Sequence, residues 1–101
     1  MDILKKPQVR NVDVQEISLK VLELIPEDSA RYYKMVPLSR TADELEVGMV
    51  NPDDSGAQEA LKFLARQGNF SYQVSLITPT SFEVVMKEYR NLRREVTKAL
   101  E

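Results

Sequence analysis

Residues 44–76 have the sequence ELEVGMVNPDDSGAQEALKFLARQGNFSYQVSL. Apolar residues occupy every second position from Leu45 to Met49, and residues 70–76 alternate in the same way, which is typical of strands. The segment between them has apolar residues three and four positions apart, the spacing of a helix: Ala57, Ala60, Leu61, Leu64 and Ala65. A strand–helix–strand unit crosses over right-handedly, so the two strands are expected to run parallel.

The ends of this central helix also carry signals. Asn51-Pro52 is a turn sequence, and Asp53, Asp54 or Ser55 can cap the helix that follows. At the other end, Gly68 is predicted to end the helix as a left-handed residue.

Upstream, residues 34–39 predict a strand, which Pro37 places at a sheet edge because proline cannot donate to a ladder. A polar turn over residues 39–43 then predicts a hairpin with the strand at 44–50. Before it, apolar spacing predicts a helix over 14–24, and a second short helix follows from Pro26 to residue 33.

Downstream, Thr78-Pro79 is a helix start, with a hydroxyl cap followed by proline in the first turn. The helix stripe that follows is Phe82, Val85, Met86, Tyr89 and Leu92.

Together these elements predict the order helix, helix, strand, strand, helix, strand, helix. The fold class is α/β (α+β), a two-layer sandwich of a three-stranded mixed sheet and about four helices. We expect an N-terminal arm over 1–13, the domain over 14–92, and a helix extension or linker over 93–101.

The composition excludes most familiar catalytic sites. None of the 101 residues is Cys or His, so thiol catalysis, Cys/His zinc sites and a Ser-His-Asp triad are excluded. The three glycines form no glycine-rich phosphate loop. The carboxylate pairs Glu27-Asp28 and Asp53-Asp54 are interpreted as helix-start residues. The chain is therefore expected to be no enzyme, with no cofactor or metal of its own.

The charges are unevenly distributed although the net charge is only −2. Residues 41–60 hold six acidic and no basic residues, whereas residues 87–98 hold five basic and two acidic ones. Either these are solvated faces, or they form a charged docking surface. The scattered aromatic residues disfavour nucleic-acid binding. No apolar run approaches the roughly 20 residues of a membrane span, so a cytoplasmic domain without direct membrane insertion is expected.

Residues 19–38, LKVLELIPEDSARYYKMVPL, resemble the N-terminal domain of type II secretion and type IV pilus assembly ATPases. In that family two short helices meet at an Ile-Pro-Glu step and continue through Ala-Arg into a strand ending in Pro-Leu. The likeness extends from Leu4 to Leu92, through the strand at 44–50, the Asn51-Pro52 turn and the closing helix.

The resemblance implies a non-catalytic docking and regulatory domain, followed in the parent chain by an ATPase domain with a P-loop. Its partner would be the cytoplasmic part of an inner-membrane platform protein, which places the domain in the cytoplasm, peripheral to that membrane. Apolar residues of the proline-bearing edge strand are the candidate docking residues, because an edge can also pair with a partner strand: Val36, Pro37 and Leu38.

The alternative function is a cyclic di-GMP receptor that regulates the same motor. Some members of the family bind this dinucleotide through two helical motifs, and residues 19–38 resemble only the second. The first begins Arg-Leu-Gly, a sequence that residues 1–10 do not contain. The candidate binding residues are Leu22, Ile25 and Pro26 around the bases and Arg31 near the phosphates. For Leu22 and Ile25 the favoured alternative is packing of the first helix onto the sheet. A third possibility is a free-standing small adaptor.

Overall fold

A mixed sheet of three strands forms the centre of the molecule. The computed structural model describes residues 12, 17–41 and 44–100, with side chains to residue 92. The strands are β1 (Met35–Arg40), β2 (Glu44–Met49) and β3 (Ser71–Leu76), in the spatial order β1-β2-β3. β1 pairs antiparallel with β2, and β2 pairs parallel with β3. The predicted hairpin and the predicted parallel pair are both confirmed.

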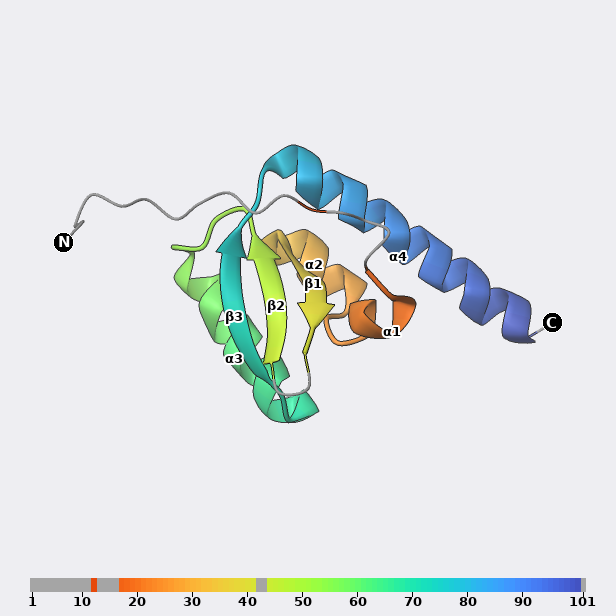
Figure 1. Ribbon diagram of the computed structural model, residues 1–101, viewed down its shortest axis with the longest axis horizontal. Coiled ribbons are helices and arrows are strands. Elements are labelled where there is room, and N and C mark those ends of the chain that lie inside the picture. The colour runs from red at the N-terminus through yellow and green to blue at the C-terminus, as the bar shows by residue number, and fades with distance from the viewer. Residues whose placement is uncertain (1–11, 13–16, 42–43, 101) are drawn as a thin grey trace.

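Four helices pack around this sheet. They are α1 (Leu19–Leu22), α2 (Glu27–Tyr33), α3 (Ser55–Gly68) and α4 (Pro79–Leu100). Figure 1 shows α2 and α3 behind the sheet, whereas α1 and α4 lie at the side of β1. The predicted element order and the α+β class with a mixed sheet are confirmed. In the described ranges, no helix has the length and apolar character needed to cross a bilayer.

The core follows the apolar patterns of the sequence. Leu45, Val47 and Met49, which alternate along β2, are fully buried. The α4 stripe is buried from Phe82 to Tyr89, and the α3 stripe buries Ala57, Leu61 and Ala65. No polar or charged residue in the described part of the chain falls into the buried class.

The predicted helix over 14–24 is shorter in the structure. Ser18 is the N-cap, and its Oγ accepts a hydrogen bond of 3.2 Å from the Val21 N–H. Ile17 therefore precedes the helix. The helix ends at Leu22, four positions before Pro26, and Pro26 lacks the N–H that a continuing helix would donate to the Leu22 carbonyl. Residues 14–16 lie outside the described residues.

The ends of α3 confirm one prediction and correct another. Asp54 is the N-cap, with its Oδ1 accepting from the N–H groups of Gly56 (2.9 Å) and Ala57 (3.3 Å). The left-handed residue is Asn69, with φ of 55°, and not Gly68. Asparagine tolerates this conformation. Glycine is required at position 68 for a steric reason, because a Cβ there would lie 2.9 Å from the ring of Phe70.

The start and end of α4 also match the sequence. Thr78 Oγ1 accepts a hydrogen bond of 3.0 Å from the Ser81 N–H, so it caps the helix as predicted. The helix continues without interruption to Leu100. Residues 93–100 are therefore an extension of α4 and not a linker.

Candidate functional site

The four candidate dinucleotide-binding residues divide between core and surface. Leu22 and Ile25 have no exposed surface and belong to the core cluster. Pro26 is exposed, and so is Arg31, whose Nη2 lies 2.9 Å from Glu27 Oε2. The structure therefore offers a ligand only two of the four side chains.

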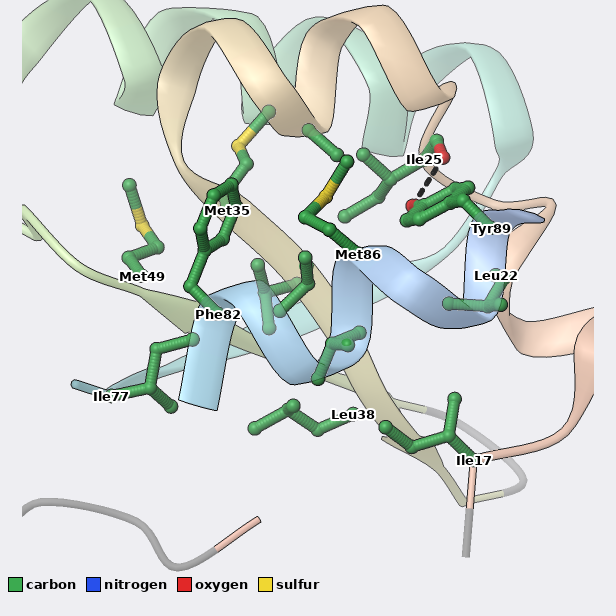
Figure 2. Close-up of a cluster of buried hydrophobic side chains, with 14 of the residues drawn as sticks. Ile17, Leu22, Ile25, Met35, Leu38, Met49, Ile77, Phe82, Met86 and Tyr89 are labelled. Carbon is green, nitrogen blue, oxygen red and sulfur yellow. Dashed lines mark hydrogen bonds between the residues drawn. The ribbon is translucent and has the colours of Figure 1, made fainter. Parts of the chain in front are cut away.

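The junction between α1 and α2 is fixed from the far end of the chain. The Tyr89 hydroxyl on α4 donates a buried hydrogen bond of 2.7 Å to the backbone carbonyl of Ile25 (Figure 2). Burial raises the pKa of the Tyr89 phenol above its ordinary range, and the Glu27 carboxylate raises it further. Tyr89 thus stays protonated and acts as a donor at neutral pH.

The prediction that Val36, Pro37 and Leu38 form an exposed docking patch is wrong. Val36 and Pro37 are almost completely buried, and Leu38 is 4% exposed. The physical reason is that α1, α2 and α4 all contact β1, so the side chains of this edge strand become part of the core.

Exposed aromatic side chains lie instead on α2 and α3. Tyr32 is 79% exposed and Phe63 is 62% exposed, the largest values among the large hydrophobic residues described. The two helices contact each other, and a Cβ at Gly56 in α3 would lie 3.7 Å from the Tyr33 ring. Tyr32 and Tyr33 also pack edge to face, with ring centres 4.7 Å apart. In the sequence these aromatic residues are scattered, and their spacing does not indicate which of them are exposed.

A small hollow of about 130 Å³ lies between α2 and α4. Arg31 contributes from α2, and the remaining lining residues come from α4: Glu83, Met86, Lys87 and Arg90. Three of the five lining residues are therefore cationic, although the chain as a whole is slightly acidic. Arg31 and the basic segment 87–98 each stand out in the sequence, but no pattern in it places them together.

A second, more open hollow of about 340 Å³ lies at the carboxyl ends of the parallel strands β2 and β3. Its lining is Val50, Asn51, Pro52, Asp53 and Leu76. Within the described residues, no group of three His, Cys, Asp or Glu side chains could hold a metal ion. Asp54 is explained by the cap of α3, whereas Asp53 lines this hollow.

With this geometry established, comparison with known proteins identifies the family. The family model for the MshEN domain matches residues 9–96. The chain belongs to the MshEN domain family. MshEN domains are the N-terminal, regulatory domains of secretion and pilus ATPases, not their catalytic part. The predicted family resemblance is therefore confirmed.

A solved structure supports the fold of this MshEN domain. It is described as MshE with cdg, that is, cyclic di-GMP, and superimposes with a TM-score of 0.67 at 22% sequence identity. The match covers 80% of this chain and 58% of the MshE chain in that structure, so this chain spans little more than half of the length of the chain it matches. No curated protein matches the chain.

Proposed function

We propose that this MshEN domain docks a secretion or pilus motor ATPase onto the cytoplasmic part of an inner-membrane platform protein. In this role the domain is cytoplasmic, reaches the membrane through its partner, and carries no catalysis of its own. The ATPase domain would lie in the parent chain, and the docked domain would pass the motion of the motor to the platform.

The observation that carries this proposal is the exposure of Tyr32 and Phe63 on adjoining helices. Tyrosine and other large aromatic residues are enriched at the centres of protein interfaces, where they bury a large area at low entropic cost. An aromatic side chain that is more than 60% exposed contributes little to the fold of the isolated domain. The α2–α3 face therefore replaces β1 as the docking surface.

The test measures binding of the domain to the purified cytoplasmic part of the platform protein from the same system. We expect Tyr32→Ala and Phe63→Ala each to weaken binding about tenfold, because interface aromatic residues often contribute 1 kcal/mol or more. Val84→Ala is the control, since Val84 is a partly exposed apolar residue (37%) on α4 and belongs to neither α2 nor α3. Isothermal titration calorimetry gives the dissociation constants.

Two results would contradict the proposal in different ways. If the wild-type domain does not bind the platform protein at all, the tethering function is wrong. If the wild type binds but both alanine variants bind equally well, docking stands and the α2–α3 face is the wrong surface.

A second candidate function is a cyclic di-GMP receptor, which the structural likeness to MshE with this dinucleotide favours. The burial of Leu22 and Ile25 disfavours it, because stacking of a base on these side chains would require the core to open. A receptor should give saturable NMR shifts over residues 19–38 with a dissociation constant of about 1 μM. Unchanged spectra at millimolar cyclic di-GMP would exclude this function for the domain by itself.

A further inference from the structure

We infer that the hollow between α2 and α4 binds a phosphate group carried by a larger molecule. This site goes beyond the docking function, because it uses a different surface and a different kind of ligand. The residues that would hold the phosphate are Arg31, Lys87 and Arg90.

Positive charges from two helices meet at this hollow. Arg31 is more than fifty positions away from Lys87 and Arg90 in the sequence, yet packing of α2 against α4 brings all three around one hollow. Glu83 is the single acidic residue in the lining. Cations that converge from two helices create a local positive potential that attracts anions, even on a protein with net negative charge.

Two of the three cations that line the hollow have no salt-bridge partner among the described residues. In the part of the chain that the structure describes, neither Lys87 nor Arg90 forms an ion pair or hydrogen bond through its side chain. Glu83 lies one helical turn before Lys87 and does not pair with it. Glu88, the other nearby carboxylate, instead accepts a hydrogen bond of 3.1 Å from the Asn91 amide.

Arg31 is held by one salt bridge and keeps donors for a second partner. Its salt bridge to Glu27 uses one of the five N–H donors of the guanidinium, so the group is held in place with donors remaining for a second partner. Planar guanidinium groups bind phosphate through paired N–H donors, and a lysine adds a point charge.

The size of the hollow sets the class of ligand. The hollow is small, with a volume of about 130 Å³. This is enough for a phosphate group with a bridging water but too small for a whole dinucleotide. Met86, which is 7% exposed, offers one apolar contact beside the three cations and no base-sized pocket. The rest of the ligand would therefore remain outside the hollow.

The primary test is an NMR titration of the ¹⁵N-labelled domain with inorganic phosphate, compared with sodium chloride at equal ionic strength. We expect saturable shifts at the Arg31 and Arg90 side-chain Nε–H signals and at the amide of residue 87, with a dissociation constant on the order of 1 mM. Arg90→Glu should weaken binding at least fivefold. Arg66→Glu is the matched control, because Arg66 is an exposed arginine on α3 and its replacement changes the net charge equally.

Two further arms identify the source of the phosphate. Co-sedimentation with phosphatidylglycerol vesicles, compared with phosphatidylcholine vesicles, reports a lipid headgroup. Titration with cyclic di-GMP reports a soluble nucleotide. Shifts at Lys87 and Arg90 would indicate this site, because both residues lie outside the binding segment predicted over residues 19–38, whereas Arg31 belongs to both. Whichever ligand binds, its affinity should be lower for the Arg90→Glu variant. Its affinity for the Arg66→Glu variant should equal that for the wild type.

The proposal is overturned if phosphate gives no more shift than chloride does. It is also overturned if Arg90→Glu and Arg66→Glu weaken phosphate binding equally, since that result would reflect net charge and not a site. Both variants change exposed residues, so circular dichroism should show both domains folded.

Discussion

Replacing Ile25 by alanine should destabilise the domain by about 2–5 kcal/mol, the range for loss of a fully buried aliphatic side chain. Ile25 has no exposed surface and lies where α1 ends and α2 begins, packed among side chains from β1 and α4 (Figure 2). Domains of this size are stable by only about 5–15 kcal/mol, so this one change removes a large share of the total. Urea unfolding followed by circular dichroism measures the loss.

Val84→Ala serves as the control for this experiment, because Val84 is more than a third exposed and should change stability by no more than about 0.5 kcal/mol. An Ile25→Ala domain as stable as the wild type would show that Ile25 is not a core residue, and that it is available to a ligand. The expected loss would instead assign Ile25 to folding, and would make it unsuitable as a probe of dinucleotide binding.

The strands and helices were predictable because their signals are local. Alternation from Leu45 to Met49 requires one buried face of a strand, and the Thr78-Pro79 pair specifies a helix start without reference to the rest of the chain. The prediction of a longer first helix was wrong because apolar spacing alone cannot show that Ser18 competes for the cap. The left-handed residue at the end of α3 was assigned one position too early for a similar reason: Gly68 and Asn69 both accept such backbone.

The site residues were less predictable because they depend on which elements meet. Pro37 correctly indicated an edge strand, yet an edge strand of the sheet is not at the protein surface when helices pack beside it. Likewise, no local pattern in the sequence brings Arg31 to Lys87 and Arg90. Periodicity shows which face of a helix is apolar, but it does not show which helix lies opposite. Tyr32 and Phe63 are a further case, because the sequence places both on helices but does not show that both side chains stay exposed.

The hydrogen bond from the Tyr89 hydroxyl to the Ile25 carbonyl joins two residues that are 64 positions apart in the sequence. Tyr89→Phe removes the only donor of that side chain while keeping the buried ring. We therefore expect a loss of about 1–3 kcal/mol at pH 8, the cost of depriving a buried carbonyl of its hydrogen-bond partner. Because α4 then holds the α1–α2 junction less firmly, amide hydrogen exchange should accelerate most around Ile25.

The same residue makes stability depend on pH in the alkaline range. Burial, with the Glu27 carboxylate as a smaller contribution, raises the pKa of Tyr89 in the folded domain above the value of about 10 in the unfolded chain. The folded state thus disfavours the phenolate. The stabilising contribution of the Tyr89 hydroxyl is therefore complete below pH 10 and is lost as the pH rises beyond it.

The difference in unfolding free energy between wild type and Tyr89→Phe should shrink by about 1.4 kcal/mol per pH unit above pH 10. Urea unfolding at pH 8, 10 and 11 measures this difference, in which the titration of all other groups cancels. A constant difference across that range would mean that Tyr89 ionises as readily in the folded domain as in the unfolded chain, and that its hydroxyl is not held in the core.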